Sequence, residues 1–218
     1  MKRPRICAVI VNSDVKAVKN VESLVDLFEV RIDLIGAGWR DVAAKLTKPW
    51  IVCNRRKEEG GGWRGSEVDR IKEFLSALEL KPAIMDIELA TESLAAIVPQ
   101  VKKQAKCLLS YHDFEGTPSL GELVGIVRRQ MKAGADIVKV VTTATKFEDN
   151  LTALQLIADL RQARVVSFAM GLLGSVSRVL CPLVGGDFTY ASIETGKESA
   201  AGQITVRDLR KLYEVLKR

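Results

Sequence analysis

A lysine inside an apolar run is the residue of this chain with the most specific chemical potential. Lys139 lies in the segment Ile-Val-Lys-Val-Val at 137–141. A lysine there either reaches out to an end or loses its water, and desolvation favours a neutral, nucleophilic amine. The alternative is a lysine neutralised by an internal carboxylate such as Glu29 or Glu59. The first interpretation predicts a Schiff base with a small carbonyl compound.

The only histidine, His112, ends another apolar run at 107–112 and precedes Asp113 and Phe114. Histidine is the side chain best suited to exchange protons near neutral pH, although a single histidine can also be structural. If the runs of His112 and Lys139 are adjacent strands, both side chains reach one small molecule. The pair therefore suggests a nucleophile and a general base.

Charged residues also alternate with apolar ones in the segment 29–33. Glu29, Arg31 and Asp33 share one face of a strand, because side chains alternate, while Val30 and Ile32 share the other. If the apolar pair packs against helices, the three charges point inward. An internal ion-pair network is the alternative interpretation. Isolated buried charges are costly, so partners or a ligand are implied.

A third candidate is the arginine that closes the segment Met-Gly-Leu-Leu-Gly-Ser-Val-Ser-Arg at 170–178. The glycines would let the backbone approach a ligand closely. Arg178 would lie near the start of a helix, where backbone amides favour an anion, and its fork suits a carboxylate. This segment predicts an anion-binding loop.

Eight strand-like runs alternate with stretches of helical period. We predict strands at 6–11, 27–33, 50–54, 83–89, 107–112, 137–142, 165–170 and 188–193. We predict helices at 15–24, 39–46, 67–78, 91–103, 120–132, 146–162, 174–180 and 206–216. This pattern favours one (β/α)8 barrel domain over residues 1–218, with chemistry at the carboxyl ends of its strands. A doubly wound open sheet is less favoured, because residues 12–14 resemble a helix N-cap rather than a glycine-rich phosphate turn.

Composition narrows the class of protein. The chain has 218 residues, 47% of them hydrophobic, and a formal net charge of +6. The basic residues are scattered, which favours a solvated surface over nucleic-acid binding. We find no signal peptide and no apolar run near the ~20 residues of a membrane span. The cysteines lack metal-like spacing, which favours free thiols in the cytoplasm; they are Cys7, Cys53, Cys107 and Cys181.

With these residues in hand, the chain resembles the type I 3-dehydroquinate dehydratases. Six pieces match the family in its order, over most of the chain. They are E-x-R-x-D at 29–33, an arginine segment ending in E-G-G at 55–61, the histidine motif at 110–114, the lysine strand at 137–139, M-G-x-x-G-x-x-S-R at 170–178 and S-x-x-G-Q at 199–203. One departure is Arg56, where bacterial members carry serine, so whether Arg55 or Arg56 faces the substrate stays open.

The resemblance implies a TIM-barrel hydro-lyase of the shikimate pathway. It would remove water from 3-dehydroquinate by syn elimination and form 3-dehydroshikimate. In this family Lys139 would form the Schiff base, His112 would act as the general base and Glu59 would orient His112. No metal or cofactor is implied, because the lysine supplies the electrophile. The resemblance also suggests a homodimer.

The resemblance further implies roles in substrate binding. Arg178 would pair with the substrate carboxylate, helped by Ser199 and Gln203. The ring hydroxyls would be held by three further residues, namely Glu29, Arg31 and Arg55. We also expect the segment 185–202 to contain a lid that is mobile when empty and closes over the substrate.

Two rival interpretations remain at this stage. An aldolase or transaldolase would also carry a lysine on the sixth strand, and Gly185–Gly186 could then cradle a phosphate. A non-catalytic basic barrel that binds nucleic acid is the second rival. The apparent fit of Arg178, Ser199 and Gln203 to a planar carboxylate favours the dehydratase.

Overall fold

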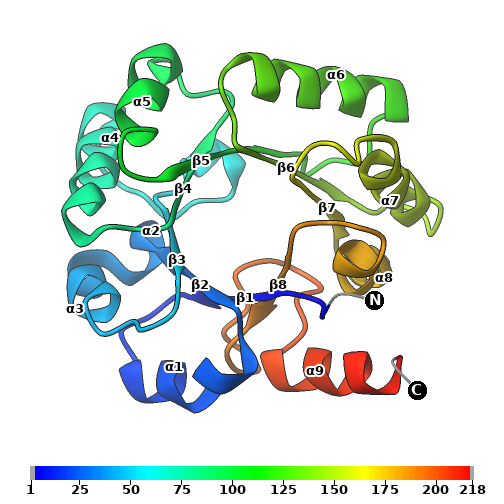
Figure 1. The fold of residues 1–218 in the computed structure, drawn as a ribbon, viewed down its shortest axis with the longest axis horizontal. Coiled ribbons are helices and arrows are strands. Elements are labelled where there is room, and N and C mark those ends of the chain that lie inside the picture. Colours follow the sequence, from blue (N-terminus) through cyan, green and yellow to red (C-terminus); the bar gives the residue numbers. More distant parts are fainter. Residues whose placement is uncertain (1–2, 217–218) are drawn as a thin grey trace.

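Parallel strands form one sheet that curls into a barrel with helices outside it (Figure 1). The computed structural model describes residues 3–216, and within them the strand order is β7-β6-β5-β4-β3-β2-β1-β8. Strand neighbours follow the chain without a reversal, so the (β/α)8 prediction is confirmed and the doubly wound sheet is wrong. The strands are β1 Ile6–Ile10, β2 Leu27–Arg31, β3 Trp50–Cys53, β4 Ile84–Glu88, β5 Lys106–His112, β6 Ile137–Thr143, β7 Val165–Met170 and β8 Thr189–Ser192.

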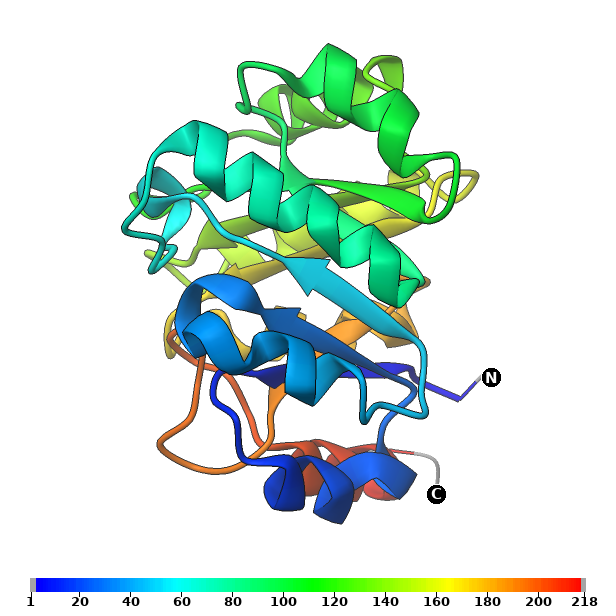
Figure 2. The ribbon, with the colours of Figure 1, turned by 90° about the vertical axis from the view of Figure 1, so that its left-hand side faces the viewer.

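Amphipathic helices surround the barrel on all sides (Figures 1 and 2). They are α1 Val15–Val21, α2 Ile32–Ile35, α3 Trp39–Ala43, α4 Glu67–Ser76, α5 Leu94–Val101, α6 Leu120–Lys132, α7 Asp149–Asp159, α8 Ser175–Leu180 and α9 Val206–Val215. Short 3-10 turns lie at Glu22–Leu24, Gly36–Gly38, Lys57–Glu59, Ala77–Leu80 and Cys181–Leu183. No helix within residues 3–216 has the length and apolar character needed to cross a bilayer.

Local sequence signals explain where several helices begin. The Asp14 side chain accepts the amide of Ala17, as expected of an N-cap after the first strand. Ser119 and Glu122 form a capping box at the start of α6. Helix α6 is therefore found at the predicted boundaries, whereas several uncapped helices are shorter than their periodicity suggested.

Inward-facing residues change character along the barrel axis. Near the amino ends of the strands they are apolar and pack together, as Leu27, Ile51 and Ile84 do. Further along, the same faces carry charge, as at Glu29 and Asp86. Strand alternation puts these residues on one face. The polar site thus rests on an apolar floor.

The second strand is shorter than predicted. Strand β2 ends at Arg31, and Asp33 lies in helix α2 instead of sharing the strand face of Glu29. The Asp33 carboxylate binds the Arg31 guanidinium at 2.6 and 2.9 Å and accepts the amides of Arg55 and Gly62. These contacts hold the turn after β2, so Asp33 anchors the rim while Glu29 and Arg31 line the interior.

The two edge strands of the sheet meet without a ladder. Within residues 3–216, β7 and β8 are the ends of the strand order. Side chains bridge this seam: the Phe168 and Tyr190 rings meet edge to face at 6.2 Å. At its base, the Asp187 amide donates to the Val165 carbonyl at 2.8 Å. At this point the barrel is therefore closed by side-chain packing and by a backbone hydrogen bond at the amino ends of the strands, in place of a ladder.

Candidate active site

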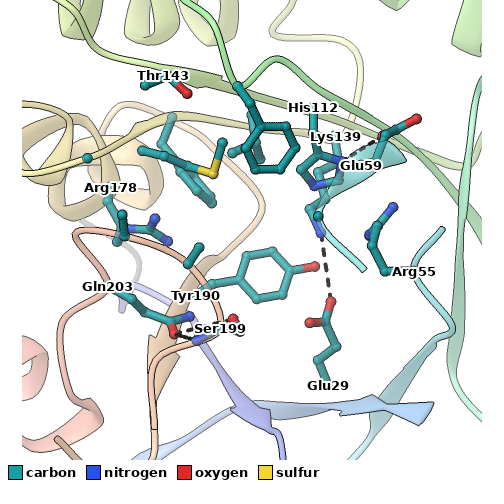
Figure 3. Close-up of a pocket in the computed structure, with 18 of the residues that line it drawn as sticks. Glu29, Arg55, Glu59, His112, Lys139, Thr143, Arg178, Tyr190, Ser199 and Gln203 are labelled. Carbon is teal, nitrogen blue, oxygen red and sulfur yellow. Dashed lines mark hydrogen bonds and ion pairs between the residues drawn. The ribbon is translucent and has the colours of Figure 1, made fainter. Parts of the chain in front are cut away.

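A cavity of about 300 Å³ opens at the carboxyl ends of the strands (Figure 3). Every residue predicted to act on or bind a substrate lines it. These residues are Glu29, Arg31, Arg55, Glu59, His112, Lys139, Arg178, Ser199 and Gln203. They come from different strands and loops, and the barrel brings them around one space.

Lys139 lies at the base of this cavity and is 5% exposed. Its Nζ is 2.8 Å from Asp86 Oδ2 and 3.7 Å from Glu29 Oε1, and it lies 4.4 Å from the centre of the Tyr190 ring. Two carboxylates and an aromatic face stabilise an ammonium. The positive charge of this buried lysine is therefore balanced by carboxylates. The nearer of them, Asp86, was not among the residues predicted from the sequence.

Asp86 and Glu88 are the missed members of the site. Both project inward from β4, and they alternate with Met85 and Ile87. The alternation that singled out Glu29 and Arg31 was present here too and would have found them. Burial alone would raise the pKa of Asp86, but Arg55 and Lys139 outweigh it and hold that pKa well below its usual range. Asp86 is thus an anion at the centre of the site.

Arg55, and not Arg56, faces the interior. The Arg55 guanidinium binds Asp86 at 2.8 Å and Glu88 at 3.0 Å, and it also donates to the Ser110 hydroxyl. Arg56 instead donates to Glu58 and to the Ala90 carbonyl on the surface. A tight turn after β3 fixes this choice, because a Cβ at Gly61 would lie 1.8 Å from the Arg55 carbonyl oxygen.

His112 and Glu59 form a hydrogen-bonded pair, with Nδ1 and Oε2 2.8 Å apart. Burial, with the positive charges of Arg55 and Lys139, holds the pKa of His112 well below its usual value. Burial also raises the pKa of Glu59 to about 7. With Glu59 ionised, a neutral His112 donates its Nδ1–H, and Nε2 is left to accept a proton. That geometry suits a general base with an orienting carboxylate.

Arg178 is on the opposite side of the cavity from Glu59 and Arg55 (Figure 3). It is 1% exposed, and its Nε and Nη2 have no hydrogen-bond partner among the described residues. Its guanidinium lies over the Phe168 ring at 4.3 Å. Burial lowers the pKa of Arg178 to about 10, so it is still a cation at neutral pH. A buried arginine fork without a partner has the geometry to bind a planar anion through two hydrogen bonds.

The loop after β8 covers part of the cavity. Gln203 Oε1 accepts the Ser199 amide at 2.8 Å, and the Gly171 amide donates to the Ala201 carbonyl at 3.1 Å. At Gly202 φ is +74°, and a Cβ there would lie 2.2 Å from the Gly171 carbonyl oxygen. Glycine is therefore required where this loop crosses the end of β7.

The Gly185–Gly186 pair lies at the other end of the barrel. It precedes β8, the Gly186 amide donates to Cys181, and the next residue, Asp187, binds the Val165 carbonyl at the start of β7. Residues before a parallel strand lie at its amino end. The predicted phosphate cradle is therefore wrong, and any lid can begin only after β8.

Three buried groups lie close enough to hold a metal. The ligand atoms of Glu29, Cys53 and Asp86 are all within 4.8 Å of one another. Burial raises the pKa of the Cys53 thiol well above its usual value, which disfavours the thiolate that binds metals. Lys139 Nζ contacts both carboxylates of this group and supplies the positive charge.

The model of the family described as "Type I 3-dehydroquinase" matches residues 6–218 of this chain. The chain belongs to the type I 3-dehydroquinase family. As a type I 3-dehydroquinase, it is a hydro-lyase, an enzyme that removes water from its substrate.

Several relatives are similar over nearly their whole length. The chain is 41% identical over 214 residues to the 3-dehydroquinate dehydratase of Dehalococcoides mccartyi strain 195, covering 98% of this chain and 96% of that one. It is 35% identical over 232 residues to the enzyme of the same name from Methanosarcina acetivorans, covering 99% and 96%. The solved 3-dehydroquinate dehydratase of Geobacillus kaustophilus is 28% identical with a TM-score of 0.86, covering 99% and 92%.

The His112–Glu59 hydrogen bond can be followed by NMR of the imidazole nitrogens. This type I 3-dehydroquinase has a single histidine, so the signals need no assignment. Above about pH 7 an ionised Glu59 accepts the Nδ1–H, so the imidazole should be the Nδ1–H tautomer. Below that pH the protonated Glu59 donates to Nδ1, and the tautomer should change to Nε2–H. Nitrogen NMR of ¹⁵N-histidine-labelled enzyme measures this change. Spectra from about pH 5.5 to about pH 8.5 span the Glu59 pKa of about 7.

Glu59→Gln is the control, since an amide in place of this carboxylate keeps an acceptor but does not titrate. The transition near pH 7 should disappear in that variant. If the same transition persists in Glu59→Gln, Glu59 is not the group that sets the tautomer.

The buried charge of Arg178 should lower the thermal stability of the enzyme when no ligand is bound. Replacing an unpaired buried cation with methionine removes a desolvation penalty, so Arg178→Met should raise the melting temperature. A gain of about 1 kcal/mol corresponds to roughly 2–4 °C in a chain of this size. Thermal unfolding measures both this variant and its matched control, Arg31→Met. The control should instead melt lower, because it strands the Asp33 carboxylate; an equal fall in both variants would contradict this account.

Proposed function

We propose that this enzyme converts 3-dehydroquinate to 3-dehydroshikimate in the shikimate pathway, through a Schiff base on Lys139. One observation carries the proposal: a single cavity holds a buried lysine, a histidine oriented as a base and an unpaired arginine. These groups match a ketone, an adjacent C–H bond and a carboxylate on one small ring. The barrel around that cavity is, in this proposal, the whole catalytic unit.

The walls of the cavity suit the rest of such a substrate. With the ketone at Lys139, the carboxylate reaches Arg178 across the cavity, where Ser199 and Gln203 also lie (Figure 3). In Figure 3, Arg55 lies on the side of Lys139 away from Arg178 and Glu29 lies below Lys139. They offer donors and acceptors to ring hydroxyls. Arg31 lines the same cavity. The arrangement distinguishes the two ends of the ring by charge.

The Schiff base forms in two steps. The Lys139 ammonium gives up a proton, and its amine adds to the ketone carbon. The proton returns to the former carbonyl oxygen of the carbinolamine, which leaves as water and gives a protonated iminium. The iminium keeps the positive charge of the original ammonium, so Asp86 at 2.8 Å can stabilise both. A pairing that holds the resting lysine thereby also favours the electron sink.

Elimination then uses the histidine twice. His112 Nε2 takes the proton from the carbon next to the iminium, and the electron pair forms an enamine. The enamine pushes out the hydroxyl on the following carbon, which leaves as water with the proton that His112 returns. Hydrolysis of the conjugated iminium by water restores the Lys139 amine. One C–H bond and one C–OH bond are lost, and one water molecule is the net by-product.

The aldolase-like alternative has less support. Its phosphate would have to bind near the carboxyl ends of β7 and β8, and the glycine pair suggested for that purpose lies at their amino ends. Arg178 with its planar fork suits a carboxylate instead.

The loop after β8 is our candidate for a lid. Residues 194–198 are exposed, and Ser199 and Gln203 line the cavity. The Ala201–Gly171 contact joins this loop to the end of β7. We propose that the loop opens for substrate entry and closes to exclude water from the iminium.

The resemblance that motivated this function also suggested a homodimer in the cytoplasm. We retain both as proposals. The four cysteines are buried thiols, which agrees with a reducing compartment. Sedimentation velocity would measure the oligomeric state.

Borohydride trapping tests the Schiff base. Incubation with 3-dehydroquinate and borohydride should reduce the iminium and attach one ligand to the peptide that holds Lys139, as read by mass spectrometry. Lys139→Ala should lose both the label and turnover. Lys132→Ala, which removes an exposed lysine of α6, should keep both. A label on a different lysine in the wild-type enzyme would rule out the assignment of Lys139.

His112→Ala should slow turnover roughly 100- to 10,000-fold, because it removes a positioned base.

Limited proteolysis tests the lid. Trypsin should cut after the exposed Lys197 readily in the free enzyme and much more slowly in the borohydride-trapped enzyme, with the fragments read on a gel. Cleavage after Arg161, an exposed residue in the turn following α7, is the internal control and should not change. Equal protection at both residues would indicate general stabilisation and would contradict a lid at this loop.

A further inference from the structure

The Tyr190 hydroxyl is a buried donor without a partner. Tyr190 projects from β8 into the cavity and is 3% exposed. Its ring is held edge to face by Phe168 at 6.2 Å and by Phe188 at 5.4 Å. Within residues 3–216 its hydroxyl makes no hydrogen bond. Buried polar groups in folded proteins are nearly always paired, so this one is set for a molecule that the protein does not supply.

A buried acceptor without a partner lies beside it. Glu29 Oε1 also makes no hydrogen bond within the described part of the chain. Its ion pair with Lys139 Nζ, at 3.7 Å, is longer than a hydrogen bond. In Figure 3 the Tyr190 hydroxyl is directed toward the Lys139–Glu29 pair. A donor and an acceptor therefore flank the reacting nitrogen.

The charges around Tyr190 keep it a donor. Burial first, then the carboxylates of Glu29 and Asp86, raise its pKa well above its usual value. The hydroxyl is thus protonated throughout the neutral range and suited to donate a hydrogen bond rather than a proton. The centre of the Tyr190 ring is 4.4 Å from Lys139 Nζ, so the side chain lies beside the reacting nitrogen.

We propose that Tyr190 is a further substrate-binding residue, whose hydroxyl donates to the substrate hydroxyl next to the ketone while that hydroxyl donates to Glu29 Oε1. The inference rests on the proposed function, because 3-dehydroquinate has one hydroxyl on the carbon beside its ketone. One hydroxyl group can be acceptor and donor at once, so it satisfies both unpaired atoms. The site would then select α-hydroxy ketones over plain ketones.

The experiment combines a variant and a substrate analogue. Tyr190→Phe removes the hydroxyl and keeps the ring that packs on Phe168 and Phe188. With 3-dehydroquinate its kcat/KM should fall about 10- to 100-fold, the usual effect of one lost buried hydrogen bond. The analogue lacking the hydroxyl next to the ketone should be a poor substrate of the wild type. For this analogue, Tyr190→Phe should lower kcat/KM by less than about threefold, because the contact that the variant removes is already absent.

Each outcome decides the question. A full 10- to 100-fold loss on both compounds would mean that the hydroxyl acts elsewhere, and the proposal would be wrong. An unchanged kcat/KM with a lower melting temperature would assign Tyr190 to a structural water bridge and also overturn it. So would a variant that cannot be trapped by borohydride, since the hydroxyl would then serve Schiff-base formation. Failure of the wild type to dehydrate 3-dehydroquinate would be a failure of the proposed function and is seen separately.

Tyr111→Phe is the matched control. Its hydroxyl donates to Asp113 at 3.2 Å near the carboxyl end of β5, but Tyr111 does not line the cavity. It should leave kcat/KM for both compounds within about twofold of wild type, as is usual for a substitution away from a site.

Discussion

The buried ion pair between Lys139 and Asp86 is the interaction on which the site depends. A lysine can be kept inside a barrel only if a carboxylate compensates its charge, and that carboxylate is itself costly to bury. Asp86 resolves this by binding Arg55 and the Ser110 hydroxyl as well as Lys139. The network then continues outward.

Glu88 extends the network from the cavity to the outer layer. It accepts from Arg55 on one side and from Arg70 of helix α4 on the other. Arg70 also holds the Asn54 carbonyl just after β3. The same charges that position the lysine therefore tie strands β3, β4, β5 and β6 to one helix. The contacts that hold Lys139 in the cavity are therefore continuous with contacts that hold the barrel together.

Two arginines of this site illustrate opposite uses of burial. Arg55 lines the cavity but is already paired with two carboxylates of its own protein, which hold it in place without a ligand. Arg178 lies against the Phe168 ring, and its Nε and Nη2 have no partner within residues 3–216, so they are available to a ligand. Sequence alone gives both residues the same type and charge. Their difference arises from what the neighbouring strands offer, which only the folded arrangement reveals.

Much of this could be predicted from residue types and spacing. The barrel followed from alternating strand-like and helical runs, and Lys139 and His112 stood out because of where their types occur. Asp86 was missed although its strand alternates as visibly as that of Glu29. Asp33 was misassigned because alternation cannot show where a strand gives way to a helix. The choice between Arg55 and Arg56 depended on a turn at Gly61, a close backbone approach that periodicity cannot express.

The seam between β7 and β8 makes one part of the barrel mouth different from the rest. On most of its circumference, each strand end is fixed to the next by a ladder, so a loop there can shift only with its strand. At the seam, the loop after β8 is joined to β7 through the Ala201–Gly171 bond. If the loop opens as proposed, releasing that bond would leave the ladders between the neighbouring strands intact. Within residues 3–216, this is thus the one place at the mouth of the barrel where a loop contact stands in for a ladder between strands.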